Sequence, residues 1–273
     1  MKTPYVQCRE LQKLSSRQKQ NCPLCGQSQT IMMRGKVRDL EDKTINVVGD
    51  KGYSFCNCRN IFFTDWKNIL LDVYDTEYSE AEGGDEGDKA NRIMEVSKQW
   101  QTVQKFMPKP KSLLNVGDYE DTFLDYLAQN NWSNMSLTTI DLIKRPSKHR
   151  LIRGNFEDHD FGEEKFDIIW MSHFIEHTKS PKDALLKAKS LLNPGGIIFN
   201  AMPDTHHINW ADPLAWYWMV QEHHTLWNMY DWITFAEEMS LKCIYNNIST
   251  DVITINDNSY RWINESRTIF KVQ

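Results

Sequence analysis

The stretch Ser112-Leu-Leu-Asn-Val-Gly117, followed by Ser136-Leu-Thr-Thr-Ile-Asp141, decides the fold. The first run is short and apolar and ends in glycine. The second is rich in β-forming residues and ends in a carboxylate. Residues 118–129 between them place apolar side chains at helical spacing. A strand, a glycine turn, a helix and a second strand that ends in an acid make up the nucleotide-binding half of a doubly wound α/β domain.

Two positions in this stretch predict how a ligand is held. Asp141, at the tip of the second strand, can accept hydrogen bonds from both hydroxyls of a ribose, although an ordinary polar strand end is the alternative. At Gly117 the backbone can approach a ligand closely because no Cβ intervenes. We therefore expect a ligand that contains a nucleoside at this turn.

The rest of the chain continues the alternation of strands and helices. Continuous apolar runs over residues 166–171 and 197–202 predict buried strands, and residues 181–192 predict a helix that begins at a proline. Residues 241–248 and 267–272 can close the sheet as an antiparallel pair. The fold class expected from this order is α/β with a Rossmann-like sheet.

The composition of the 273-residue chain excludes several classes of protein. The chain is 40% hydrophobic and 12% aromatic, so it can bury a sizeable core. Its net charge of −5 argues against a surface built for nucleic acid or anionic lipid. No apolar run approaches the roughly 20 residues of a membrane span, and the first residues lack the apolar stretch of a secretory signal. We expect a cytoplasmic protein without a membrane partner.

Four cysteines form two close pairs near the N-terminus. Cys22 and Cys25 stand in a C-x-x-C turn, and Cys56 and Cys58 in a C-x-C turn, with β-like sequence between the pairs. Tetrahedral Zn²⁺ takes about four thiolate or imidazole ligands, and a complete four-cysteine shell leaves no open position. The pattern therefore predicts a structural zinc ion in a ribbon-like domain over residues 1–65, with reduced buried thiols as the alternative.

Composition divides the remainder of the chain. Residues 66–110 are predicted to be a helical connector that contains an acidic, glycine-rich loop, and residues 111–273 the α/β domain. Residues 203–227 hold four tryptophans and four histidines among polar residues. Long aromatic loops at the carboxyl edge of such a sheet often cover a ligand, which is what we expect of this segment.

Together these pieces resemble a class I S-adenosylmethionine-dependent methyltransferase. The subgroup that the chain resembles has an N-terminal zinc-binding ribbon and is typified by the C-methyltransferases of deoxysugar biosynthesis. The resemblance covers nearly the whole chain and implies a seven-stranded methyltransferase sheet. Its motifs are the two cysteine pairs, Val73–Tyr78, Leu114–Gly117, Phe166–Ile169 with Glu176-His177, Leu191–Gly196 and Gln221–His223.

The resemblance implies a set of residues that hold the cofactor. Asn115 and Gly117 would line its methionine end, and Asp141 would hold its ribose. The adenine would meet Asn155 and Phe156. By the same resemblance His173, which follows the fourth strand, would face the methyl donor.

The resemblance also implies catalytic residues and a substrate. Glu222 and His223 would handle a proton beside the reacting atom, and Tyr78 would close over the substrate. A histidine of near-neutral pKa steadied by a glutamate suits this task, with His224 and His173 as alternative bases. The implied substrate is a small molecule, a nucleotide-linked sugar or related carbohydrate. Glu176-His177 is instead expected to satisfy the start of a helix.

One turn departs from the pattern of the resembled family. That family carries G-x-G-x-G where this chain has Gly117-Asp-Tyr-Glu-Asp121, with two added carboxylates and the ring of Tyr119. Either the turn is remodelled and the cofactor still binds, or the chain is a catalytically silent methyltransferase-like module that binds a partner. We favour methyl transfer. A third reading, a zinc ribbon that contacts nucleic acid, is disfavoured by the acidic net charge.

Overall fold

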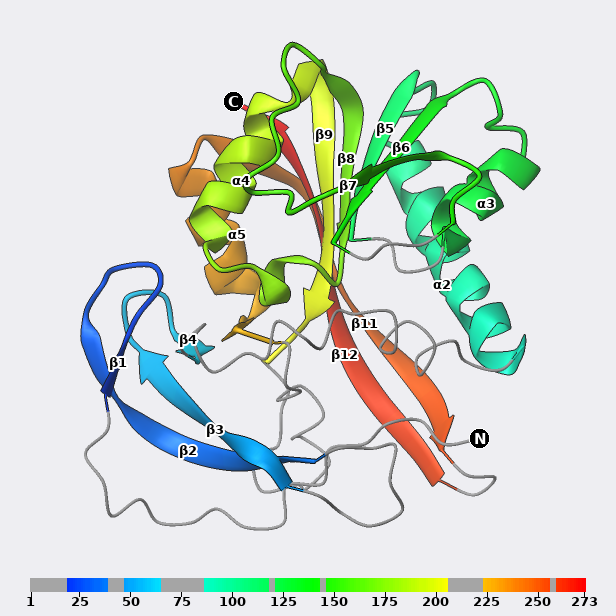
Figure 1. The fold of residues 1–273 in the computed structure, drawn as a ribbon. Helices are drawn as coiled ribbons and strands as arrows, with labels where there is room; N and C mark the ends of the chain where they lie inside the picture. The colour runs from blue at the N-terminus through cyan, green and yellow to red at the C-terminus, as the bar shows by residue number, and fades with distance from the viewer. Residues whose placement is uncertain are drawn as a thin grey trace.

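The structure is a computed structural model that describes residues 19–38, 47–64, 86–117, 121–142, 146–205, 223–255 and 259–273. These residues form two sheets (Figure 1). The first has seven strands in the order β11-β12-β9-β8-β5-β6-β7, and the second has five in the order β1-β2-β3-β4-β10. The seven-stranded sheet confirms the expected Rossmann-like α/β fold.

Five parallel strands form the centre of the larger sheet. They are β5 (Ser112–Val116), β6 (Ser136–Asp141), β7 (Arg150–Arg153), β8 (Phe166–Ser172) and β9 (Leu192–Pro203). β5 lies between β6 and β8 and pairs parallel with both.

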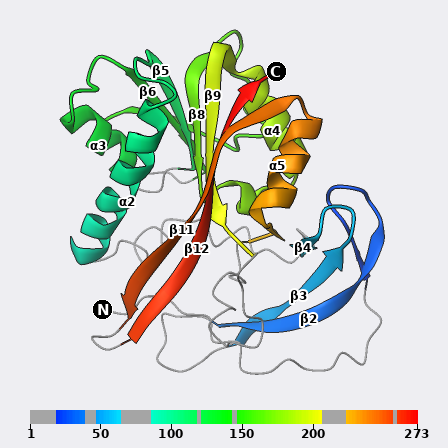
Figure 2. The same cartoon turned by 180° about the vertical axis from the view of Figure 1, so that it is seen from behind.

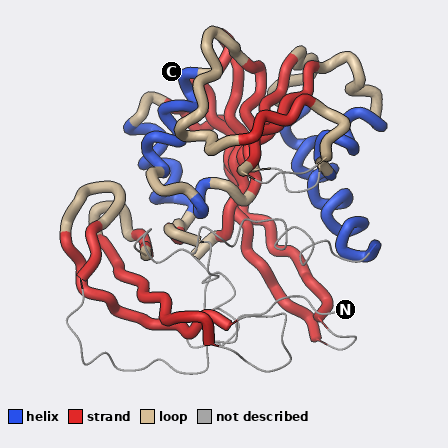
Figure 3. Tube along the Cα trace, viewed as in Figure 1, coloured by secondary structure: helices blue, strands red, loops and turns tan. Residues whose placement is uncertain are grey.

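An antiparallel pair completes this sheet. β12 (Ser259–Val272) runs antiparallel to β9, and β11 (Leu241–Ile255) runs antiparallel to β12. Both strands are longer than the sequence predicted, because their pairing continues from Leu241↔Val272 out to Ile255↔Ser259. Figure 3 shows the resulting hairpin extending well beyond the other strands.

Helices cover both faces of the larger sheet (Figures 1 and 2). α2 (Glu86–Gln104) and α3 (Thr122–Gln129) pack on one face, and α4 (Pro181–Ser190) and α5 (Met229–Glu238) on the other. Side-chain caps fix where α4 and α5 begin. Ser180 accepts a hydrogen bond from the Asp183 amide at 3.3 Å, and Asn228 accepts one from the Asp231 amide at 3.0 Å.

Alternation along each strand divides the core between the two faces. Leu113 and Ile168 face α2 and α3, whereas Leu114 and Ile169 face α4 and α5. Trp170 lies in the α2–α3 layer, 1% exposed. The sheet is therefore buried on both sides, as the continuous apolar runs predict.

The smaller sheet carries the cysteine pairs. β1 (Lys19–Asn21), β2 (Ser28–Arg38), β3 (Val47–Cys56) and β4 (Ile61–Phe63) come from the N-terminal part, whereas β10 (Thr225–Leu226) arrives from beyond β9. β10 pairs antiparallel with β4. Two side-chain contacts join the sheet to α5, the Arg59–Glu238 ion pair and a 3.1 Å hydrogen bond from Asn60 to Asp231. We call residues 19–38 and 47–64 the cysteine unit. Its buried residues Cys22, Cys56, Ile61 and Phe63 share a core with the α4–α5 side of the larger sheet.

Candidate functional site

The carboxyl ends of the parallel strands meet at one edge of the larger sheet, on the side of the cysteine unit (Figure 1). Gly117 follows β5, Asp141 ends β6, Asn155 follows β7 and His173 follows β8. Ligands of open α/β sheets bind outside this edge. The structure therefore brings four of the predicted cofactor residues to one place, and Asn115 lies just before Gly117 in β5, 4% exposed.

The turn after β5 keeps the backbone conformation that glycine favours. Gly117 has φ +75°, and a Cβ there would lie 3.2 Å from the Phe174 ring. Asp121 also has a positive φ of 57° although it carries a side chain, and its left-handed conformation delays the start of α3 to Thr122. We expected the helix from residue 118, so this start is a correction. Gly117 thus leaves room at the strand end, and Asp141 supplies a carboxylate beside it, so the described residues fit a nucleoside ligand at this edge.

The next two strand ends offer polar groups of different kinds. Asp141 is 9% exposed, and its backbone oxygen accepts a hydrogen bond from Gly154 at 2.9 Å. The side-chain oxygen of Asn155 accepts a hydrogen bond from the Glu157 amide at 2.7 Å, so the amide group of Asn155 is what can reach a ligand. Phe156 is 3% exposed and belongs to the α4–α5 side of the core. Its contact with adenine stays a prediction.

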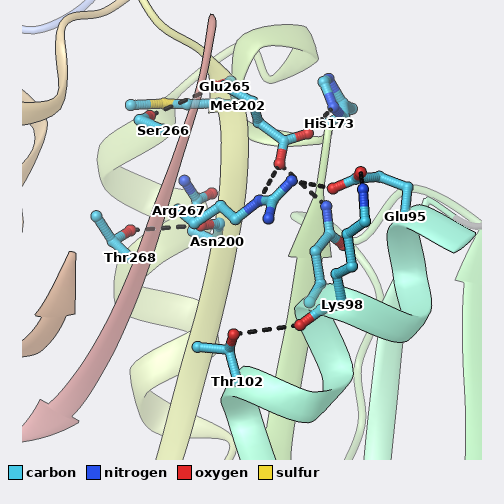
Figure 4. Close-up of polar contacts among 11 residues, drawn as sticks. Glu95, Lys98, Thr102, His173, Asn200, Met202, Glu265, Ser266, Arg267 and Thr268 are labelled. Carbon is cyan, nitrogen blue, oxygen red and sulfur yellow. Dashed lines mark hydrogen bonds and ion pairs between the residues drawn. The ribbon is translucent and has the colours of Figure 1, made fainter. Parts of the chain in front are cut away.

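His173 is held between two buried carboxylates, those of Glu176 and Glu265. Figure 4 shows it beside Glu265. Its Nε2 lies 2.8 Å from Glu265 Oε2, and its Nδ1 lies 3.2 Å from Glu176 Oε1. The backbone at His173 has φ +51°, and its amide donates a hydrogen bond to the Ala201 carbonyl at 2.8 Å. The side chain nevertheless stays 41% exposed at the strand edge. The strand end thus presents an imidazole whose two nitrogens are both engaged.

These carboxylates decide the protonation state of His173. Burial lowers the pKa of its imidazole, but the hydrogen bonds and charges of Glu176 and Glu265 outweigh burial and raise the pKa to about 10. Solvent at the exposed part of the ring weakens this shift without reversing its direction. An imidazolium cannot accept a proton, so His173 does not suit the alternative role of base that the sequence allowed.

The carboxylate of Glu265 also binds an arginine that sequence analysis missed. Arg267 Nε donates to Glu265 Oε1 at 2.6 Å, and Gln99 Nε2 of α2 donates to the same oxygen at 3.1 Å. Arg267 further pairs with Glu95 of α2. The available signal was the pair of charges two residues apart in β12, which places Glu265 and Arg267 on one face of a buried strand. This network ties α2 to the end of β8.

His223 lies where the cysteine unit meets the larger sheet. It is 6% exposed, its carbonyl accepts a hydrogen bond from the Tyr53 hydroxyl at 2.9 Å, and its ring meets the His177 ring edge-on at 4.7 Å. The amide of His224 donates to the Glu176 carbonyl at 2.6 Å. His223 and His224, which the sequence offered as candidate bases, therefore lie close to Glu176 and His177.

Three predicted residues cannot be placed. Tyr78, Tyr119 and Glu222 lie outside the described residues. The role expected of Glu176 was wrong: the short helix Ile175–His177 has Phe174 at its N-cap without a side-chain cap, and Glu176 does not bind the start of that helix. Its ion pair with His173 accounts for one of the two oxygens.

The four predicted metal ligands come together in the cysteine unit. Cys22 Sγ lies 3.6 Å from Cys58 Sγ, and Cys25 Sγ lies 3.6 Å from Cys56 Sγ. All four sulfur atoms lie within 4.8 Å of one another. Zinc–sulfur bonds of about 2.3 Å at tetrahedral angles hold sulfur atoms about 3.8 Å apart, so the cluster fits this ion. Burial raises the pKa of Cys22 to about 11, which means that a thiolate there needs a nearby cation.

Comparison with protein families identifies the class of this site. Residues 91–243, more than half of the chain, match a family described as a methyltransferase domain. The chain belongs to this family and is an S-adenosylmethionine-dependent methyltransferase. No curated protein sequence matches the chain.

Solved structures show the same fold. One is a Burkholderia thailandensis 1,6-didemethyltoxoflavin-N1-methyltransferase bound to 1,6-didemethyltoxoflavin and S-adenosylhomocysteine. It matches with 12% identity and a TM-score of 0.50, over 87% of this chain and 100% of that one. Another, a Bacillus halodurans protein provisionally assigned as a methyltransferase, matches with 14% identity and a TM-score of 0.51, over 65% of this chain and 99% of that one. At these identities the matches support the fold alone.

Among the helices that the structure describes, none is long and apolar enough to cross a membrane.

Proposed function

We propose that this enzyme transfers a methyl group from S-adenosylmethionine to a small molecule, specifically to a nucleotide-linked sugar or related carbohydrate. The observation that carries the proposal is the meeting of Gly117, Asp141 and His173 at the carboxyl edge of the sheet of a methyltransferase family member. The sugar rests on the motifs shared with deoxysugar C-methyltransferases. A silent scaffold is the less favoured alternative, because the chain belongs to a methyltransferase family.

Each residue at this edge has a proposed task. When bound, S-adenosylmethionine supplies a methyl group activated by a sulfonium. Asp141 would accept hydrogen bonds from the ribose, and Asn115 and Gly117 would lie along the methionine end. Asn155 and Phe156 would bound the adenine end. The charge of His173 is balanced by Glu176 and Glu265, and Arg267 shares the Glu265 carboxylate, so the ion pairs hold the imidazole of His173 in place at the end of β8.

The acceptor side of the reaction is assigned to residues near the cysteine unit. We propose that His223 with Glu222 receives the proton of the acceptor, and that Tyr78 closes over the substrate. His223 suits this role better than His173, because the His173 ring is held as an imidazolium. Alignment of acceptor and methyl group supplies much of the rate, since a fixed near-attack geometry removes the entropy of bringing the two together.

Replacing Asp141 by alanine tests the proposed cofactor site. Hydrogen bonds to a charged group contribute about 1.5–3 kcal/mol, so we expect binding of S-adenosylhomocysteine to weaken about 10-fold to 100-fold. Isothermal titration calorimetry measures this change. The control is Asp158→Ala, which removes an exposed carboxylate in the segment after β7. This variant should bind S-adenosylhomocysteine as the wild type does. Equal affinity of the wild type and Asp141→Ala for S-adenosylhomocysteine would contradict the assigned site. Absence of binding by the wild type would favour the silent scaffold.

We also propose a structural Zn²⁺ bound by Cys22, Cys25, Cys56 and Cys58. The support is their clustering and the free state of all five cysteines among the described residues. Free thiols are typical of the cytoplasm, where we propose that the enzyme works. The division into a ribbon-like unit over residues 1–65, a connector over residues 66–110 and a methyltransferase domain over residues 111–273 is part of the same proposal.

Cys56→Ser tests the zinc proposal. Loss of one thiolate from a four-cysteine shell opens it to water, so the zinc that co-purifies at this cluster should fall from about one equivalent to a small fraction of one. Metal analysis of protein purified without added zinc gives the result. Cys243→Ser, which changes a cysteine outside the cluster, should retain the metal. Equal metal content in the two variants would contradict the assignment.

A further inference from the structure

A second cluster of ligating side chains lies outside the cysteine unit. Glu176 and His177 end the short helix Ile175–His177 after β8, and His223 directly precedes His224 and β10. One ligand atom from each of Glu176, His177 and His223 lies within 4.8 Å of the other two. The cluster thus joins two segments that are more than forty positions apart in the chain.

The carboxylate of Glu176 indicates that this cluster is built for a cation. Its side chain is 1% exposed, and its two oxygens differ in their surroundings. Oε1 pairs with His173 Nδ1 at 3.2 Å, whereas Oε2 has no polar partner in the part of the chain that the structure describes. A buried carboxylate oxygen without a partner is costly, and a cation bound at Oε2 would remove that cost. This observation is independent of the spacing of the three side chains.

Hydrogen bonds fix the backbone of the three ligating residues before any ion binds. The amide of His224 donates to the Glu176 carbonyl at 2.6 Å, and the Tyr53 hydroxyl donates to the His223 carbonyl at 2.9 Å. The amide of His177 donates to the Phe174 carbonyl at 3.0 Å. Ligand bonds of about 2.1 Å at tetrahedral angles need donor atoms about 3.4 Å apart, which side-chain rotation alone can supply from the present spacing.

The ligand types limit the choice of metal. Two imidazoles and one carboxylate suit Zn²⁺ and its neighbours among the divalent transition metals, whereas Mg²⁺ and Ca²⁺ prefer oxygen ligands. Three protein ligands leave a fourth position open, which is the arrangement of catalytic rather than structural zinc sites. His173 would then orient Glu176 from behind, as outer partners of metal ligands commonly do.

We propose that Glu176, His177 and His223 bind a divalent transition metal of the Zn²⁺ class, whose open position takes an oxygen of the acceptor substrate. The use of that oxygen rests on the methyl transfer proposed above; the metal site itself does not. It changes the role given to His223: its ring nitrogen would be a ligand while the metal is bound, so the proton of the acceptor hydroxyl would leave to solvent rather than to His223. The metal would lower the pKa of the bound hydroxyl and hold it beside the edge of the sheet.

Cobalt titration of the full-length protein, stripped of metal and kept reduced, tests this site. We expect two equivalents of Co²⁺ to bind. One should give the strong near-ultraviolet absorption of thiolate-to-metal charge transfer, and the second should give only the weak visible bands of a nitrogen and oxygen site. His177→Gln and His223→Gln should each weaken the second equivalent at least 10-fold and leave the first unchanged.

Two further variants keep the result interpretable. Cys56→Ser should weaken the thiolate equivalent and spare the other, and His159→Gln, a histidine outside both clusters, should bind two equivalents like the wild type. His177 is only half-buried, so its variant is informative even if Glu176→Gln fails to fold. A single equivalent in the wild type, or a second one that survives both histidine variants, would overturn the proposal. The titration contains no S-adenosylmethionine, so its result holds whether or not methyl transfer is confirmed.

Discussion

Trp170→Ala is expected to lower the free energy of unfolding by about 3–5 kcal/mol. The Trp170 ring stacks on Phe123 of α3 and on Phe199 of β9, with centroids 4.0 Å away in both cases, and a third contact reaches Trp100 of α2 at 6.3 Å. Truncation at this position removes the group that joins a helix layer to two central strands. Because a domain is stable by only about 5–15 kcal/mol in all, the variant should lose a large part of its stability.

Urea denaturation followed by tryptophan fluorescence and circular dichroism measures this loss. Trp132→Ala is the matched control, because Trp132 also packs on Trp100, at 5.0 Å, but is partly exposed outside the sheet. We expect its effect to be less than half as large. Similar losses in the two variants would mean that Trp170 is not the centre of this layer.

Arg267→Met is expected to cost about 3–5 kcal/mol, because it leaves a carboxylate in the core with one partner fewer. The Arg267 side chain is 7% exposed and that of Glu265 is 6% exposed. Replacing both partners, in Glu265→Gln with Arg267→Met, should recover part of the loss, since the unpaired charge is then gone. A double variant that loses more free energy of unfolding than the two single variants lose together would contradict this account.

The pH dependence of stability gives an independent reading of the same network. Burial raises the pKa of Glu265, but His173 and then Arg267 outweigh burial and lower the pKa from 4.5 to about 2. A carboxyl whose pKa is lower in the folded state stabilises the protein above its unfolded pKa, and this contribution is lost as the pH falls from about 4.5 toward 2. Between about pH 6 and pH 3.5 the wild type should therefore lose about 1 kcal/mol more than Glu265→Gln. Equal losses would mean that Glu265 is not ionised in the folded protein.

Local patterns predicted much of this molecule. The apolar run that ends at Gly117 and the run that ends at Asp141 identified adjacent parallel strands, because buried strands need continuous apolar sequence and the turn needs a left-handed residue. Cysteine spacing identified the cluster in the same way. In both cases the interaction that fixes the structure lies within a few residues of the pattern.

Long-range contacts could not be predicted in this way. Arg267 meets Glu95 across 172 positions of sequence, and no period in either segment indicates that pairing. β10 has two residues, too few for any alternation to show, and its partner β4 lies more than 150 positions earlier. Glu176 and His173 form an ion pair although only three positions separate them, and this pair too was missed. His173 adopts a positive φ, a conformation that is uncommon for residues other than glycine and that the sequence did not indicate.

The two-residue strand β10 makes the cysteine unit and the reaction centre mechanically dependent on each other. Thr225 and Leu226 pair with β4 as an antiparallel strand. Just before them, the His223 carbonyl accepts a hydrogen bond from the Tyr53 hydroxyl, and the His224 amide donates one to the Glu176 carbonyl. Any loosening of the cysteine unit would therefore be transmitted over a few ångströms to the histidines proposed to act on the acceptor. Chelation or oxidation of the thiols should register as a fall in turnover while the larger sheet is still folded, because the N-terminal unit shares its core with the α4–α5 side of that sheet.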